Sequence, residues 1–266
     1  MDLAMDADEL AAVGLRFEVD GAVATVTLDR PDVRNAQTPA MWRALARIGE
    51  RVPDDVRVVM VRGAGQSFSA GLDRAMLDPR GSGDGAESVA GLLAKDDAEI
   101  SATIDDYQRG FTWLRDPRFL SVAVVQGHAI GAGFQLALSC DLRVASEDAQ
   151  FCMKESALGL VPDLTGTKPL VDCVGYARAL EICVTARMVG AAEAAAIGIA
   201  ALAVPADELD ATVSDLVGAL TAPMAGAVTE TKALLQAAPD QSLDDQRRLE
   251  REAQVRRFRE LARLMG

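Results

Sequence analysis

The sequence predicts an α/β fold, because apolar runs recur between stretches with helical spacing. Strand-like runs at 56–62, 120–126 and 141–145 are separated by segments in which apolar residues repeat at helical intervals. Strands that alternate with helices favour βα-type repeats and a largely parallel sheet. The chain has 266 residues, half of them hydrophobic, so it can form one large domain or a core with an appendage.

The elements before the first of these strands are a hairpin and a helix. Residues 15–29 alternate around Asp20-Gly21, a strong local signal for a two-residue hairpin turn. Helical periodicity follows over 38–52, where Thr38 suits the N-cap and Pro39 suits the first helical position.

A further helix is expected at about 97–115, after a glycine-rich stretch at 79–87. Polar segments rich in glycine are usually flexible. We therefore interpret residues 79–87 as a linker, with a flap over a pocket as the alternative.

The chain ends in three predicted helices, over 207–220, 223–238 and 242–265. Pro223 is compatible only with a first turn, which places the start of the second helix. The last helix carries an apolar stripe at i, i+3, i+4 and i+7, formed by Phe258, Leu261, Ala262 and Met265. Such a stripe packs either on the chain's own core or on another subunit.

Charge and composition exclude several classes of partner. The chain holds 27 basic and 40 acidic residues, a net charge of −13, which argues against nucleic acid or an anionic membrane. No apolar run approaches the roughly 18 residues that span a bilayer. One histidine, and four cysteines without C-x-x-C spacing, predict no metal site. The N-terminus does not read as a signal peptide, so the cysteines are expected to be reduced thiols of a cytoplasmic protein.

Two glycine-rich turns carry the strongest functional signal, and each follows an apolar run. The first spans 63–73, and the second spans 127–133 and continues into a helical pattern. Glycine lets a backbone bend sharply and approach a ligand closely. Two such turns can aim two peptide N–H groups at one oxygen, and the second adds the positive end of a helix. This arrangement suits an oxyanion hole, as for the enolate of a thioester.

Four segments resemble the crotonase (enoyl-CoA hydratase/isomerase) superfamily, in the family's order: 23–36, 63–73, 127–133 and 149–162. Any one glycine motif recurs by chance, but the four together cover most of the chain. The resemblance implies a spiral of ββα units at 1–200 that holds an acyl-CoA site. It implies a C-terminal helical region at 201–266 for oligomerisation, as a homotrimer or dimer of trimers. The expected ligand is an acyl-CoA thioester, so coenzyme A enters with the substrate and no separate cofactor is expected.

The resemblance places the two oxyanion N–H donors on Leu72 and Ala132. Because a backbone donor does not depend on its side chain, leucine and alanine are acceptable there, provided that Ala132 has ordinary backbone angles. The implied coenzyme A contacts are Arg30, Arg34, Ala70 and Asp73. For the two arginines, a solvated or ion-paired side chain is the competing interpretation.

The acid/base positions depart from the hydratase pattern. By resemblance, hydratases use two glutamates, one just after the second glycine turn and one twenty residues later. These positions are Gln135 and Glu155 here. An amide cannot exchange a proton near neutral pH, although it can hold a water or a substrate oxygen. Ordinary hydration is therefore doubtful.

A different carboxylate follows Glu155 by eight residues, at Asp163. The family's dienoyl-CoA isomerases carry an aspartate at this place, paired with a glutamate at the position of Glu155. Its dehalogenases carry a nucleophilic aspartate there, but with pocket tryptophans and a histidine base, and this chain has two tryptophans in all. Two carboxylates that flank an acyl chain could move a double bond. The alternative is that Asp163 caps the following helix.

The sequence thus predicts an acyl-CoA enzyme that stabilises a thioester enolate and shifts C=C double bonds of an enoyl- or dienoyl-CoA. Its predicted catalytic residues are Glu155, Asp163, Leu72, Ala132 and Gln135. The alternative within enzymes is a 2-enoyl-CoA hydratase of fatty-acid oxidation, in which Gln135 only positions water. The alternative of another class is a non-catalytic acyl-CoA-binding protein.

Overall fold

The computed structural model describes residues 7–77 and 88–265 and confirms the α/β class. Its helices are α1 (Ala7–Ala12), α2 (Pro39–Gly49), α3 (Val89–Leu92), α4 (Asp97–Thr112), α5 (Ala132–Ser139), α6 (Thr167–Val174), α7 (Tyr176–Thr185), α8 (Ala191–Ala196), α9 (Leu209–Thr221), α10 (Ala225–Ala237) and α11 (Leu243–Met265). Its strands are β1 (Leu15–Asp20), β2 (Val23–Leu28), β3 (Val58–Gly63), β4 (Leu120–Val125), β5 (His128–Ile130), β6 (Leu142–Ser146), β7 (Gln150–Cys152), β8 (Val189–Gly190) and β9 (Leu202–Val204). The stretch 79–87, interpreted as a linker, lies outside the described residues.

The strands form two sheets, one of six strands in the order β1-β2-β3-β4-β6-β9 and one of three in the order β5-β7-β8. Except for the β1–β2 hairpin, every pair in the larger sheet is parallel. After β4 the chain adds β5 to the smaller sheet and then forms α5; after β6 it adds β7 and then enters helical segments. This repetition is the spiral of ββα units that the resemblance implies.

The central strands of the larger sheet, β3, β4 and β6, are buried on both faces. Successive side chains of a strand point to opposite sides, and in β3 they alternate between two cores. Val59 and Val61 belong to the main core, beneath α2, α4 and α5, whereas Val58 packs with Leu209 and Val213 of α9. Burial on both faces explains why these strands read as continuous valine-rich runs.

The predicted hairpin is confirmed, with its turn shifted by one residue. Asp20 still pairs with Val23, so the loop is Gly21-Ala22 rather than Asp20-Gly21. Gly21 has a φ of +53°, a backbone angle that glycine adopts without strain. Residue 20 is therefore the last position of the ladder rather than part of the turn.

Two of the predicted helices begin as expected. The side chain of Thr38 accepts a hydrogen bond from the N–H of Met41 at 3.3 Å, and Pro39 opens α2, which ends at Gly49 rather than residue 52. A capping box that Asp96 forms with Glu99 starts α4. The helix predicted to residue 115 ends at Thr112 and continues as a short 3₁₀ turn.

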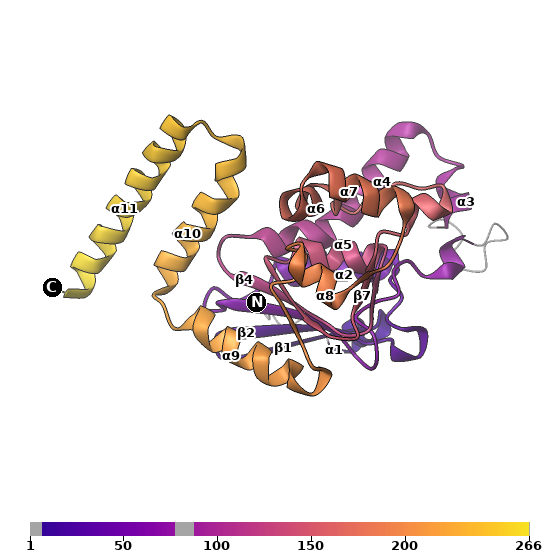
Figure 1. Cartoon of the computed structure of the whole chain (residues 1–266), viewed down its shortest axis with the longest axis horizontal. Helices are drawn as coiled ribbons and strands as arrows, with labels where there is room; N and C mark the ends of the chain where they lie inside the picture. The colour runs from indigo at the N-terminus through magenta and orange to yellow at the C-terminus, as the bar shows by residue number, and fades with distance from the viewer. Residues whose placement is uncertain (1–6, 78–87, 266) are drawn as a thin grey trace.

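The three C-terminal helices are confirmed, but α10 starts later than predicted. Pro223 lies two residues before its first residue, Ala225, in the break after α9. Proline has no N–H to donate and clashes with the preceding turn, so here it ends one helix rather than opening the next. Figure 1 shows α10 and α11 as a hairpin that stands away from the rest of the molecule. On α11, Phe258 and Met265 of the predicted stripe are 61% and 86% exposed.

A buried lysine fixes α10 to the core. The Nζ of Lys232 donates to the carbonyls of Asp116 and Phe119 and to Oδ2 of Asp141, each at 2.7 Å. Burial lowers the pKa of Lys232, and the Asp141 carboxylate opposes that shift. Because all three N–H donors of the ammonium group have acceptors, the buried charge is satisfied where the C-terminal hairpin meets the sheet.

Among the described residues, no single helix is long and apolar enough to cross a membrane. The pair Ala206–Thr221 and Ala225–Asp240 reaches that length and composition only together, and it is bent by 99°. The described part of the chain also brings together no three His, Cys, Asp or Glu side chains that could hold a metal ion.

Candidate active site

The two glycine-rich turns lie side by side. The N–H of Ser69 donates to the carbonyl of His128 at 2.8 Å, and the N–H of Ile130 donates back to the carbonyl of Ser69 at 3.0 Å. Gly71 has a φ of +86°, and a Cβ there would lie 2.4 Å from the carbonyl oxygen of Ile130. A Cβ on Gly133 would lie 2.6 Å from the carbonyl oxygen of Ser69. Glycine is therefore required at both positions for the turns to approach this closely.

The close approach brings together the two backbone donors that the sequence predicts. Ala132 is the first residue of α5, whose N-cap is Gly131, so its N–H has no partner within the helix. Within the described residues, neither the N–H of Leu72 nor that of Ala132 has an acceptor. A Cβ on Gly71, the residue before Leu72, would lie 3.4 Å from the nitrogen of Ala132. Ala132 has ordinary helical backbone angles, as the prediction required.

A buried polar network shapes the first turn, and sequence reasoning did not identify it. The Nδ2 of Asn35 donates to the carbonyls of Ala64 and Ser67, at 2.9 and 2.8 Å. The Oγ of Ser69 donates to the carbonyl of Asn35, and the Nε2 of Gln37 donates to that same Oγ. Asn35 has a φ of +55°, which asparagine tolerates better than most residues. The available sequence signal was a pair of amide residues, Asn35 and Gln37, between two apolar segments.

Glu155 lies against the second turn. It opens a 3₁₀ turn, Glu155–Leu158, and is 8% exposed. Its Oε1 accepts a hydrogen bond from Nε2 of Gln135 at 2.7 Å, while its buried Oε2 has no partner within the described residues. A Cβ on Gly131 would lie 3.3 Å from that Oε1. The carboxylate therefore sits beside the residue that precedes the Ala132 donor, with one oxygen uncommitted.

Burial raises the pKa of Glu155, and the negative charge of Asp163 raises it further. Hydrogen bonds from backbone N–H groups and from Gln135 act in the opposite direction, because they stabilise the ionised form. The interaction with Asp163 shows that the structure brings these two predicted carboxylates into one electrostatic environment. Burial also raises the pKa of Asp163.

Asp163 does not cap the following helix, so that alternative is wrong. The N-cap of α6 is Gly166, and no side chain caps the helix. The backbone of Asp163 is instead tied to α4, because Nε2 of Gln108 donates to its carbonyl at 2.7 Å. The Asp163 carboxylate is thus available for another role.

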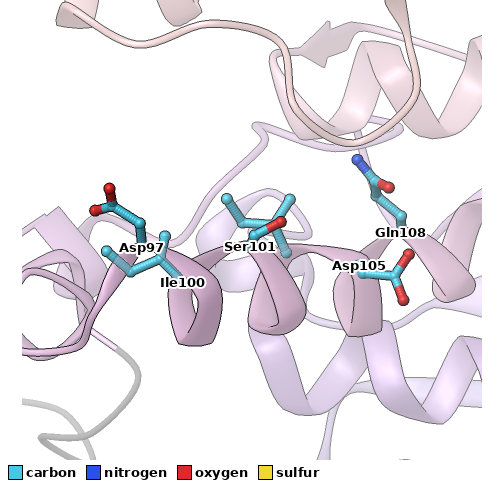
Figure 2. A pocket seen from close by; sticks show the side chains of 6 residues that line it. Asp97, Ile100, Ser101, Asp105 and Gln108 are labelled. Carbon is cyan, nitrogen blue, oxygen red and sulfur yellow. The ribbon is translucent and has the colours of Figure 1, made fainter.

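A cavity of about 420 Å³ lies along α4 beside this contact. It is lined by Asp97, Ile100, Ser101, Ile104, Asp105 and Gln108. Figure 2 shows the row of labelled side chains along one helix, with Gln108 at the end that reaches toward a neighbouring loop. Gln108 therefore connects the cavity to the segment that carries Asp163, whereas Leu72, Ala132 and Glu155 do not line it.

The four predicted coenzyme A contacts form two pairs in the structure, Arg30 with Asp73 and Arg34 with Ala70. Arg30 and Asp73 bind each other, with Nη1 2.9 Å from Oδ2, and the same Nη1 donates to the carbonyl of Ala36. The competing ion-pair interpretation thus describes Arg30. Arg34 is exposed and lines a cavity of about 630 Å³, and its carbonyl accepts from the N–H of Ala70 at 2.8 Å. Its guanidinium is therefore open to solvent at the first turn.

The model of the enoyl-CoA hydratase/isomerase family matches residues 18–266 of this chain. A relative named "Probable enoyl-CoA hydratase" from Rhizobium meliloti is 32% identical over 197 residues, which are 73% of this chain and 70% of the relative. A peroxisomal Delta(3,5)-Delta(2,4)-dienoyl-CoA isomerase from Arabidopsis thaliana is 30% identical over 226 residues, which are 83% of this chain and 80% of the relative.

The fold is also shared with solved structures. A Thermobifida fusca protein provisionally named an enoyl-CoA hydratase, solved in complex with acetoacetyl-CoA, is 50% identical and superimposes with a TM-score of 0.91. That match covers 96% of this chain and 98% of the other. The same protein solved with CoA is 51% identical, with a TM-score of 0.92 over 98% of both chains.

Proposed function

The chain belongs to the enoyl-CoA hydratase/isomerase family, and from that premise we propose that it shifts C=C double bonds of an enoyl- or dienoyl-CoA. The bound thioester carbonyl would accept hydrogen bonds from the N–H groups of Leu72 and Ala132. Donors preorganised at such an oxygen stabilise the enolate that forms when a neighbouring carbon loses a proton. Acetoacetyl-CoA in the Thermobifida fusca relative supports a CoA thioester as the substrate class.

The observation that carries the isomerase proposal is the pair formed by Glu155 and Asp163. A double-bond shift removes a proton from one carbon of the substrate and returns a proton to another. One ionised carboxylate can take the first proton, and one protonated carboxyl can supply the second. Glu155 offers an unpartnered Oε2, Asp163 is not used as a helix cap, and each pKa is raised. Raised pKa values keep one proton on the pair at a higher pH than two exposed carboxyls would.

Hydration of a 2-enoyl-CoA is the second candidate, and the names of most of the similar relatives favour it. Hydration needs groups that activate a water and protonate a carbon. At the first of the two hydratase positions this chain has Gln135, which is fully buried. Its carbonyl oxygen accepts from the N–H groups of Leu164 and Gly166, and its amide donates to Glu155. These contacts support the isomerase over the hydratase.

The test is turnover of three classes of CoA ester: a 3,5-dienoyl-CoA, a 3-enoyl-CoA and a 2-enoyl-CoA. We expect the diene or the 3-enoyl ester to be isomerised, a change that ultraviolet absorbance measures. We expect the 2-enoyl ester to be hydrated at least roughly 10²-fold more slowly, because a positioned acid or base is worth roughly 10²–10⁴-fold. Faster hydration than isomerisation would establish the hydratase instead. A melting temperature raised by acyl-CoA without any turnover would indicate a binding protein, because a ligand of the folded state stabilises it.

We also propose that the protein is a homotrimer or a dimer of trimers assembled through α10 and α11. Large apolar side chains are exposed on one face of α11 in the single chain, among them Val255, Phe258 and Met265. An exposed apolar face of this kind is typical of a subunit contact. Light scattering coupled to size exclusion should give three or six times the 28.1 kDa chain mass, and Phe258→Asp should reduce it. A monomer at micromolar concentration would contradict the proposal.

A further inference from the structure

Gln135 connects the two carboxyl-bearing segments of the site. It lies on α5 and is completely buried. Its Oε1 accepts from the N–H of Leu164 at 2.9 Å and from the N–H of Gly166 at 3.2 Å, while its Nε2 donates to Oε1 of Glu155 at 2.7 Å. The assignment of Oε1 and Nε2 cannot be exchanged by an amide flip, because the NH₂ would then face two N–H donors and the oxygen would face a carboxylate.

The loop that carries Asp163 is formed closely around this amide. Thr165 has a φ of +69°, and this left-handed residue turns the N–H groups on either side of it toward the same oxygen. A Cβ on Gly166 would lie 2.6 Å from Cγ of Gln135. The loop thus has little room to shift while the glutamine is in place, and Asp163 directly precedes the first of the two donors.

We propose that Gln135 is a positioning residue: it keeps Glu155 ionised with Oε2 directed to the substrate, and it fixes the loop that presents Asp163. This inference rests on the proposed isomerase function, and the role that it assigns to the buried amide differs from holding a water. Its N–H donor favours the carboxylate form of Glu155, since a carboxylic acid gains less from a donated hydrogen bond. Its oxygen restrains the Asp163 loop through the two backbone bonds.

A glutamate at position 135 would fit the loop but change the chemistry. One carboxylate oxygen could accept the same two N–H bonds, because paired N–H groups of this kind bind anions well. The other oxygen would face Oε1 of Glu155 at the present 2.7 Å contact. Two carboxylates at that distance cannot both ionise, so they would share a proton. Glu155 would then pair with residue 135 rather than act with Asp163.

The experiment is a pH titration of Glu155 by carboxyl ¹³C NMR in protein labelled at glutamate, with the signal assigned by its loss in Glu155→Gln. Gln135→Met removes the donor, and we expect the Glu155 midpoint to rise by about one pH unit or more, the worth of a hydrogen bond to a charged group. Gln135→Glu keeps both loop bonds and should give two coupled transitions, one of them above the wild-type midpoint.

Gln108→Met is the matched control. It removes a hydrogen bond to the backbone of Asp163 but none to Glu155, so the Glu155 midpoint should stay within a few tenths of a pH unit. An unchanged midpoint in folded Gln135→Met would overturn the proposal and leave Gln135 as a packing residue. Because the NMR titration needs no turnover, its result does not depend on whether the protein is an isomerase.

Kinetics supply a second readout for the same variants. If the protein isomerises a dienoyl-CoA, Gln135→Met should lower kcat by roughly ten- to a hundredfold with little change in KM. The acid limb of its pH–rate profile should move to higher pH, because the pKa of Glu155 rises. A rise in KM at constant kcat would contradict a positioning role in proton transfer. If Gln135→Met does not fold, Gln135→Glu, which preserves the bonds to Leu164 and Gly166, tests the contact itself: a Glu155 signal without a coupled second transition would contradict the proposal.

Discussion

Glu155→Gln is expected to lower the rate of double-bond isomerisation by roughly 10²–10⁴-fold, the usual worth of a positioned acid or base. The glutamine can still accept the hydrogen bond from Gln135, since it keeps one side-chain oxygen. It loses the ionisable group beside Gly131 to which we assign the proton transfer. The binding of acyl-CoA, which we assign to the two glycine turns, should stay within a few-fold of wild type.

The measurement is kcat for a dienoyl-CoA together with the Kd of a non-reactive acyl-CoA. Glu147→Gln is the matched control, because Glu147 is an exposed glutamate in the loop between β6 and β7. It should isomerise at the wild-type rate. A Glu155→Gln protein that binds and isomerises normally would remove Glu155 from the reaction, and a loss of binding without a fall in kcat would assign it to substrate positioning.

The pH dependence of the wild-type enzyme follows from the direction of the pKa shifts. Isomerisation through this pair needs one carboxylate and one carboxylic acid, so the rate should fall at both low and high pH. Burial raises both pKa values, and the negative charge of Asp163 raises that of Glu155 further. Both limbs of the profile should therefore lie at higher pH than for two exposed carboxyls, and they belong to the pair rather than to one residue. In Glu155→Gln the profile should keep a single limb.

The backbone part of the site could be predicted because its requirements are visible in the residue types. Gly71 and Gly131 have φ values of +86° and +51°, and both appear in the sequence as glycines at the ends of apolar runs. The order of the turns along the chain follows from the parallel strands that carry them. Local signals also placed the start of α2, since Thr38 and Pro39 act within a single turn.

The side-chain part could not be predicted, because its partners are distant along the chain and chemically interchangeable. Gln135 bonds to residues 20, 29 and 31 positions away, and its amide could equally have bound water. Arg30 meets Asp73 across 43 positions, although the sequence implied that both contact coenzyme A. Gln108, which holds the carbonyl of Asp163 from another helix, gave no signal, because an amide on a helix is usually solvated. These hydrogen bonds depend on how α4 and α5 pack against the 163–166 loop, which local sequence does not show.

Asp163→Asn is expected to retain the fold and acyl-CoA affinity but to isomerise roughly 10²–10⁴-fold more slowly. Asparagine has nearly the same shape and keeps a side-chain oxygen, but it cannot carry a proton near neutral pH. The contact that Gln108 makes to residue 163 is with the backbone, so it should survive the substitution. The measurement is kcat for a dienoyl-CoA, with Kd for a non-reactive acyl-CoA alongside.

Stability provides an independent check on the same variant. Burial raises the folded-state pKa of Asp163 above its ordinary value of 3.8, so the folded protein holds this proton more tightly than the unfolded chain. The stability that Asp163 contributes is therefore full below the unfolded pKa and is lost as pH rises through the folded pKa. Asp163→Asn lacks this loss, so its melting temperature relative to wild type should be higher at pH 7 than at pH 4. A difference that does not change with pH would show that the carboxyl is not buried in this way.

Asp163→Ala and a double mutant separate a structural role of Asp163 from a catalytic one. Because no side chain caps α6, the alanine variant should melt close to the asparagine variant, and a drop of several degrees in alanine alone would restore a structural role for the aspartate. The variant Glu155→Gln/Asp163→Asn should be much less impaired than the product of the two single losses, because residues that serve one transfer are not additive. Additive losses would mean that the two carboxyls act in separate steps, and a normal rate in Asp163→Asn would leave Glu155 as the single base.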